Sequence, residues 1–141
     1  MIKILIVDPN DPFRRLLKKV LGNRFAFADI REAADGGQGL QLLQTFNPDL
    51  LFLEIHLPSE SGLELARRIK TDRPEIIIVL LTSDNLPEYK AAAVKSGIAH
   101  VVPKDDWTGE DMIALVQTIL SDMHVNDQNH HNPSLKQEHS S

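Results

Sequence analysis

The chain has 141 residues, is 42% hydrophobic and carries a formal net charge of -5 at pH 7. This size suits one domain with a sizeable core. The absence of cysteine excludes disulfides, thiolate metal sites and cysteine nucleophiles, and suits a reducing compartment. The acidic balance argues against direct nucleic-acid binding, which relies on clustered Lys and Arg. No apolar run approaches the roughly 18 residues of a membrane helix, so we expect a cytoplasmic protein without a membrane partner.

Strands and amphipathic helices alternate along the first half of the chain. Residues 2–7 are an apolar run that ends at Asp8, which predicts a strand. The next segment places apolar residues at helical spacing: Phe13, Leu16, Leu17, Val20 and Leu21. Gly22 is a plausible end for this helix. The more alternating residues 25–31 predict a second strand, less thoroughly covered than the centre of the sheet.

The third strand carries the most informative residue. Asp35 is placed to cap a second helix, which contains Leu40, Leu43 and Phe46, and Asn47-Pro48 stops it. The apolar residues 50–55 then follow without alternation, as in a strand covered on both faces. Glu54 is the single carboxylate in this run, and it lies at the C-terminal end of the strand.

The second half continues the alternation. Ser61 and Glu64 form a capping-box pattern before a third helix, which directs Leu65, Ala66 and Ile69 to the core. Residues 76–81 are the most hydrophobic and β-branched stretch and predict a central strand.

The last two helices and the fifth strand complete the pattern. Asn85 and Glu88 suggest a cap for the fourth helix, which Gly97 ends, and residues 99–102 predict the fifth strand. Thr108 caps a final helix. Its apolar face comprises Met112, Val116, Ile119, Leu120 and Met123.

Five strands and five helices in strict alternation predict an α/β fold, a doubly wound parallel sheet with helices on both faces. In such sheets ligands bind beyond the C-terminal ends of the strands. Asp8, Glu54, Thr82 and Lys104 each follow or close a separate strand at that end. The fold therefore predicts that four residues distant in sequence meet in one crevice, although each alone reads as an ordinary surface or turn residue.

We assign residues 1–123 to this domain and expect residues 124–141 to be a disordered tail or linker, because few of the latter are apolar. The tail could lead to an effector domain or be the natural end of the chain. Its histidines, including His130 and His131, read as solvated rather than as metal ligands.

Several motifs in order resemble the response-regulator receiver domain of two-component signalling, over roughly residues 2–121. They are Ile-Leu-Ile-Val-Asp at 4–8, Glu-Ala-Ala-Asp-Gly at 32–36, Pro-Asp-Leu-Leu-Phe-Leu-Glu-Ile-His-Leu-Pro at 48–58, Leu-Thr-Ser at 81–83 and Lys104. The resemblance implies a flavodoxin-like receiver fold with strand order 2-1-3-4-5.

The resemblance also implies residue roles. In this family an aspartate at the end of the third strand accepts a phosphoryl group, while Mg²⁺ is held by that aspartate, an acid after the first strand and a backbone carbonyl. By position, Asp8 matches an acid of the metal pocket and the His56 carbonyl the remaining ligand. Thr82 and Lys104 match the residues that hold the phosphoryl oxygens.

Two departures set this chain apart from the pattern. Glu54 stands where the family has the phosphoacceptor aspartate, and its extra methylene misplaces the carboxylate for in-line attack. Pro9 replaces the second acid and offers no side-chain oxygen to Mg²⁺, which demands near-ideal octahedral geometry. We expect weak or absent Mg²⁺ binding, with Asp11 more suited to cap a helix than to replace the missing ligand. Glu54 could instead reach toward Lys104 and Thr82.

These features predict a pseudo-receiver that is not an enzyme and acts as a protein-interaction module without phosphorylation. One alternative is a phosphorelay receiver that uses Mg²⁺ in an unusual geometry. Another is a flavodoxin-like or phosphatase-like enzyme. The lack of a Gly-rich phosphate loop after Val7 argues against this alternative. The expected partners are proteins, namely a kinase, another signalling protein or an output domain, and the resemblance implies a possible homodimer through the fourth and fifth helices. In the family, an aromatic residue whose movement often accompanies switching occupies the position of Val101. Valine has no ring to move, so the coupling between the threonine and this position is not expected here.

Overall fold

The computed structural model describes residues 1–84 and 87–131, with side chains described as far as Met123. Contacts between residues divide the chain into Met1–Trp107 and Thr108–Ser141. Among the described residues, the first part contains the sheet and four helices, and the second contains one helix.

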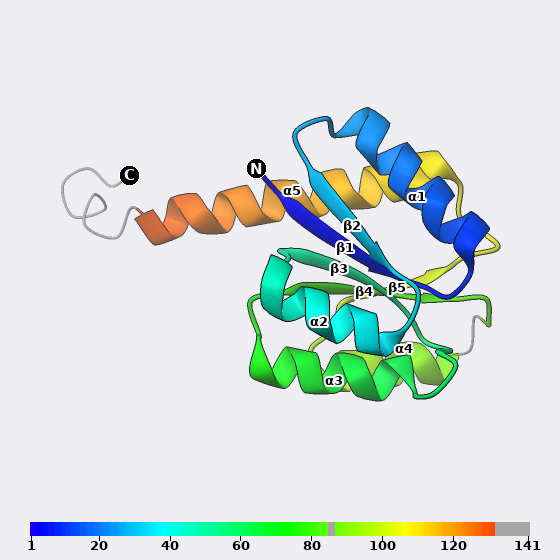
Figure 1. Cartoon of the computed structure of the whole chain (residues 1–141). Helices are drawn as coiled ribbons and strands as arrows, with labels where there is room; N and C mark the ends of the chain where they lie inside the picture. The colour runs from blue at the N-terminus through cyan, green and yellow to red at the C-terminus, as the bar shows by residue number, and fades with distance from the viewer. Residues whose placement is uncertain (85–86, 132–141) are drawn as a thin grey trace. The chain divides into compact units, whose positions relative to one another are not determined.

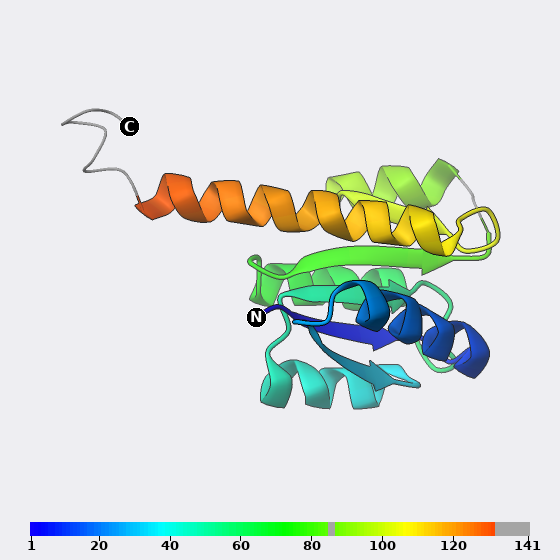
Figure 2. The same cartoon turned by 90° about the horizontal axis from the view of Figure 1, so that it is seen from above.

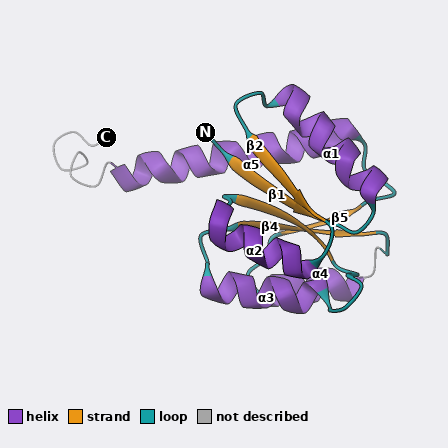
Figure 3. Cartoon of the chain, in the orientation of Figure 1, coloured by secondary structure: helices purple, strands orange, loops and turns teal. Residues whose placement is uncertain are grey.

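The first part is built on one five-stranded parallel sheet of order β2-β1-β3-β4-β5. Figure 3 shows the strands in orange, and all of them run in the same direction. The strands are β1 (Lys3–Val7), β2 (Asp29–Ala33), β3 (Leu50–Glu54), β4 (Ile77–Thr82) and β5 (His100–Pro103). This is the strand order that the receiver resemblance implies, and all five C-terminal ends lie at one edge.

Four helices of this part cover the sheet. They are α1 (Asp11–Arg24), α2 (Gly36–Phe46), α3 (Gly62–Asp72) and α4 (Pro87–Lys95). Figure 1 shows α1 on one side of the sheet and α2 and α3 on the other. In the view from above, α2 lies along β1 and β2 (Figure 2), which it contacts.

The core follows the alternation of side chains along the strands. Leu5 and Val7 of β1, with Leu51 and Leu53 of β3, belong to one apolar cluster with buried residues of α2, α3 and α4. Their neighbours along the strands, such as Ile4 and Phe52, point to the opposite face and are also fully buried. The sheet is therefore covered on both faces, as its continuous apolar strands predict.

Local sequence signals set most helix boundaries as predicted. The Asp35 carboxylate accepts a hydrogen bond from the Gln38 amide at 2.9 Å, and the Ser61 hydroxyl accepts one from the Glu64 amide at 3.3 Å. Asn47 ends α2 in the left-handed conformation, with φ 55°. Gly97, with φ 78°, follows α4. The predicted cap at Asn85 lies outside the described residues.

The region between β1 and β2 differs from the prediction. Helix α1 continues past Gly22 to Arg24, and β2 begins at Asp29, not at residue 25. Phe25, which we predicted to be in the strand, is the buried C-cap residue of α1, 3% exposed. Its alternation with Phe27 imitates a strand, but the Ala28 amide donates to the Phe25 carbonyl in a turn.

The buried face of α1 also differs from its apolar pattern. Leu16, predicted to face the core, is 60% exposed, and the buried residues are Arg14, Leu17 and Leu21. The helix begins after Asn10, whose side chain accepts from the Phe13 amide at 3.0 Å. The predicted cap, Asp11, is instead the first helical residue.

The second part contains α5 (Gly109–His131). Thr108 and Asp111 form a reciprocal cap: the Asp111 amide donates to the Thr108 hydroxyl and the Thr108 amide to the Asp111 carboxylate. Met112, Val116 and Ile119 are buried, as their spacing predicts. The helix runs eight residues past the boundary predicted at 123, because residues 110–132 contain no glycine or proline to stop it. Residues 132–141 of the expected tail lie outside the described residues.

Candidate functional site

Three charged side chains meet at the C-terminal edge of the sheet. The Lys104 Nζ, after β5, lies 2.7 Å from Asp8 Oδ2, after β1, and 2.7 Å from Glu54 Oε1, at the end of β3. Asp8 is 0% exposed and Glu54 is 4% exposed. We call this arrangement of Asp8, Lys104 and Glu54 the lysine bridge. It joins three strands through one ammonium group.

Backbone amides occupy the remaining oxygens of both carboxylates. The Asn10 amide donates to Asp8 Oδ1 and the His56 amide to Glu54 Oε2, each at 2.8 Å. Among the described residues, no buried side-chain nitrogen or oxygen lacks a hydrogen-bond partner. Each carboxylate therefore has both oxygens engaged, as burial of a charge requires.

The environment of Lys104 favours its charged form. Burial lowers the pKa of Lys104, but hydrogen bonds and charge attraction from Asp8 and Glu54 outweigh burial and raise this pKa above its ordinary value. The ring of Phe13, from α1, lies 4.4 Å from Nζ and covers the ammonium group. The bridge therefore contains a protonated lysine at neutral pH.

Thr82 reaches the same edge but does not join the lysine bridge through its side chain. Its hydroxyl donates to the Asp84 carbonyl and accepts from the Asp84 amide, both at 2.9 Å. Its carbonyl accepts from the Lys104 amide at 2.8 Å. Of the two contacts anticipated for Glu54, the structure shows the one to Lys104, whereas Thr82 is held in a local turn.

His56 links the end of β3 to α4. Its Nε2 lies 3.2 Å from Asp84 Oδ2 and 3.3 Å from the Tyr89 hydroxyl, and its ring meets that of Tyr89 edge to face. Both His56 and Asp84 are half exposed, so this contact is weak. Val101 has no ring and packs against the apolar cluster.

Arg14 is a site neighbour that the sequence reasoning missed. It is 7% exposed, and its NH1 donates to the Asp8 carbonyl at 2.7 Å. Nε donates to Glu32 at 2.9 Å, and NH2 lies 2.7 Å from Asp11. Burial lowers the pKa of Arg14, but hydrogen bonds and charge attraction from Glu32 and Asp11 raise it overall. One sequence signal could have found it: Arg14 lies three residues before Leu17, and residues with this spacing share a face of a helix.

The residues present do not fit a Mg²⁺ ion. An ammonium group already lies between Asp8 and Glu54, and Pro9 supplies no oxygen. Asp11, considered above as a replacement for the acid missing at position 9, pairs with Arg14. In the part of the chain that the structure describes, no group of three or more His, Cys, Asp or Glu is placed to hold a metal ion. The side chains of the tail histidines lie outside that part.

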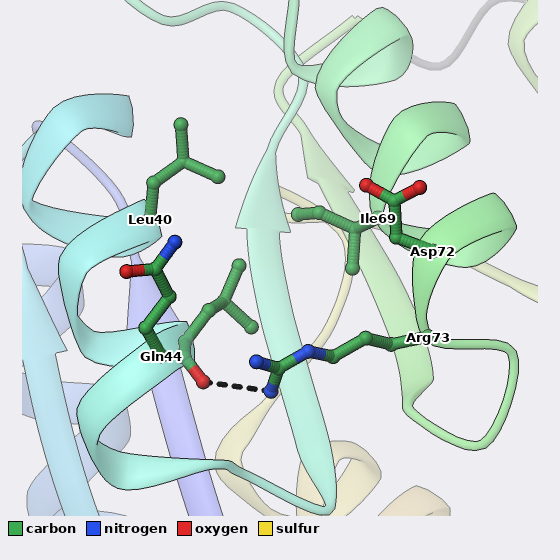
Figure 4. Close-up of a pocket in the computed structure, with 6 residues that line it drawn as sticks. Leu40, Gln44, Ile69, Asp72 and Arg73 are labelled. Atoms are coloured by element: carbon green, nitrogen blue, oxygen red, sulfur yellow. Dashed lines mark hydrogen bonds between the residues drawn. The ribbon is translucent and has the colours of Figure 1, made fainter.

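Two surface pockets lie away from the lysine bridge. One, of about 210 Å³, lies between α2 and α3 and is shown in Figure 4, where Arg73 extends toward the end of α2. The other, of about 230 Å³, lies beside His56, Glu60 and Tyr89. Neither of these two pockets is lined by Asp8, Glu54 or Lys104.

Comparison with known proteins identifies the family. The response regulator receiver domain model matches residues 4–125, and the chain belongs to this family. It is 30% identical to chemotaxis protein CheY of Halobacterium salinarum over 102 residues, 72% of this chain and 83% of that protein. It is 25% identical to transcriptional regulatory protein DegU of Brevibacillus brevis over 118 residues, 84% of this chain and 48% of that protein.

Solved structures share the fold. The CheY-like receiver domain protein from Methanospirillum hungatei JF-1 superimposes with a TM-score of 0.82 at 21% identity, covering 89% of this chain and 98% of that one. The chain spans 59%, 48% and 32% of three curated relatives that it matches. No described helix is long and apolar enough to cross a membrane.

Proposed function

We propose that this receiver domain is a pseudo-receiver, a signalling module that acts through protein contacts without phosphorylation. The observation that carries the proposal is the lysine bridge, in which Glu54 has one oxygen on Lys104 and the other on the His56 amide. Phosphoryl transfer would require the Glu54 carboxylate to leave Lys104 and then share that lysine with the incoming phosphoryl oxygens.

Geometry further opposes the reaction. Glutamate carries one more methylene than aspartate, and a misplacement of about 1 Å can reduce a rate by roughly 10²-fold. The metal that would neutralise the incoming charge has poor ligands, because Pro9 supplies no side-chain oxygen in place of the missing acid. We infer weak Mg²⁺ binding at most.

The bridge is also an incomplete imitation of a phosphorylated site. A carboxylate carries one negative charge, against about 1.5 to 2 for a phosphoryl group. It engages Lys104, whereas the hydroxyl of Thr82 remains on Asp84. We propose that the domain rests in one arrangement, which its protein partners recognise directly.

The proposed partners are a kinase, another signalling protein or an output domain, and we propose neither catalysis nor direct nucleic-acid binding by this domain. The similarity to part of DegU is consistent with an output domain elsewhere in a longer protein. A homodimer through α4 and α5 stays a prediction, which sedimentation of the chain over a range of concentrations would test. A monomer at high concentration would contradict it.

The decisive experiment offers the protein Mg²⁺ and a small acyl phosphate and measures its intact mass. We expect the wild type to remain unmodified. The double variant Glu54→Asp with Pro9→Asp restores the family's residue type at both positions. It should gain a phosphoryl group on residue 54. The single variant Glu54→Asp tests how much the metal ligand at position 9 matters.

Glu54→Gln serves as the matched control, since it keeps the length of the side chain and cannot form an acyl phosphate. Stoichiometric phosphorylation of wild-type Glu54 or Asp8 would overturn the proposal and support the phosphorelay alternative. Binding of beryllofluoride that depends on Mg²⁺ would point the same way.

A further inference from the structure

Arg14 is a buried cation, and one of its contacts reaches the backbone of the site. Its guanidinium group contacts the Asp8 carbonyl, the Glu32 carboxylate and the Asp11 carboxylate at 2.7 to 2.9 Å. Its side chain is only 9% exposed. Of these contacts, the one to Asp8 reaches the lysine bridge, and it comes from α1 rather than from the sheet.

We propose that Arg14 is a positioning residue for the lysine bridge, which holds the Asp8 backbone so that the Asp8 carboxylate meets Lys104. The inference rests on the proposed function, in which that bridge is the resting arrangement of the domain. It assigns to α1 a direct part in fixing the site.

Asp8 needs such a hold because of the charges around it. Asp8 and Glu54 both lie 2.7 Å from one Nζ, so the two carboxylates repel each other across a shared cation. The Asp8 amide is bound to Ala33 at 3.1 Å, and the next residue, Pro9, has no amide hydrogen to donate. The Arg14 contact fixes the carbonyl side of Asp8, where the chain leaves the sheet.

The competing explanation is that Arg14 only attaches α1 to β2. Its pairing with Glu32 would do so, and Lys18 on the same helix lies 3.5 Å from the other oxygen of Glu32. Lys18 therefore provides a matched control: it is a cation on the same helix with the same partner, but the structure shows no contact between Lys18 and Asp8.

Two amides report the distinction. The Asn10 amide donates to the Asp8 carboxylate, next to Arg14, whereas the His56 amide donates to Glu54, on the far side of the lysine bridge from Arg14. Native-state hydrogen exchange should be measured for both amides in the wild type, Arg14→Met and Lys18→Met. Amides within β4 serve as an internal reference for global stability.

In Arg14→Met we expect the exchange of both amides to accelerate relative to the wild type, by roughly tenfold or more beyond any acceleration of the β4 amides, the loss expected for a hydrogen bond to a charged group. Lys18→Met should leave both unchanged. Acceleration at Asn10 without His56, or equal acceleration of all amides, would overturn the positioning role and leave Arg14 a purely structural anchor.

A second variant keeps the test decisive if Arg14→Met does not fold. Glu32→Gln retains Arg14 and its charge but weakens its anchor, and should accelerate both amides in the same direction by a smaller factor. An unchanged His56 amide in this variant would also overturn the inference. The measurement uses no phosphodonor, so its result is independent of whether residue 54 can be phosphorylated.

Discussion

Lys104 is the only cation that contacts both Asp8 and Glu54 among the described ion pairs. Lys104→Met would keep much of the side-chain volume and leave two buried carboxylates without a counter-ion. We expect a loss of about 3–5 kcal/mol in the free energy of unfolding, the usual penalty for removing one partner of a buried pair. Urea unfolding would measure it. The exposed Lys90→Met is the control, expected to stay within about 0.5 kcal/mol of the wild type.

The bridge also predicts a pH dependence. Because the folded-state pKa of Lys104 is raised, its contribution to stability is fully present below the unfolded pKa of about 10.4 and is lost as pH rises through the higher folded value. The stability difference between wild type and Lys104→Met should therefore be level from neutral pH to about pH 10 and shrink above it. A decline already near neutral pH would contradict the assignment.

Gly62 fixes the loop that follows Glu54. A Cβ at this position would overlap the Glu54 carbonyl oxygen and lie 2.8 Å from the Ile55 Cα, and neither backbone atom can move aside cheaply. Gly62→Ala should lower the free energy of unfolding by about 1–3 kcal/mol or more. Gly22→Ala, inside α1 with its nearest contact at 3.9 Å, should instead stabilise by roughly 0.5–1 kcal/mol. Thermal or urea unfolding of both variants makes the comparison.

At the scale of elements, Arg73 connects α3 to the end of α2. Its NH1 donates to the Leu43 carbonyl at 2.8 Å and to the Asn47 side chain at 2.9 Å. Arg73→Met should lose about 1–2 kcal/mol, since a cation there satisfies a helix C-terminus. Arg67→Met, which breaks only an exposed pair with Glu64, is the control with little expected change. Equal losses in urea unfolding would count against the capping role.

Elements with explicit stop and start residues could be predicted from the sequence. Asp35, Ser61 and Thr108 act as predicted because their side chains bond amides only a few residues away. The start of β2 could not be predicted in the same way. Phe25 is buried by tertiary packing, and its spacing from Phe27 resembles the alternation of apolar residues in a strand. Arg14 was missed for a related reason: a basic residue in a basic helix reads as solvated, and only the fold brings Asp8 and Glu32 to it.

At the scale of the whole molecule, the sheet buries apolar side chains on both faces. Phe52, at the centre of β3, is 0% exposed, whereas Phe27 is 57% exposed. Phe52→Ala should lower the free energy of unfolding by about 3–5 kcal/mol, through lost burial and a residual cavity. Phe27→Ala should have a much smaller effect. Comparable losses in urea unfolding would mean that the core is not centred on β3.

The convergence of Asp8, Glu54 and Lys104 follows from topology, because parallel strands end at one edge. The sequence therefore predicted that these three residues meet at this edge. It could not predict that Thr82 would bond to Asp84 instead of Glu54, because a difference between two hydrogen-bond partners depends on loop geometry. The strand order came from resemblance to receiver domains, and periodicity alone does not specify it.

The lysine bridge also has an evolutionary consequence. Losing one of Asp8, Glu54 or Lys104 leaves buried charge uncompensated, whereas replacing all three by apolar residues of similar volume is often neutral or stabilising. A single substitution in the bridge is therefore destabilising, even though replacing all three residues together is not. A lineage that no longer needs the phosphoryl chemistry would still keep these charges, trapped by the intermediates that separate it from a simpler core.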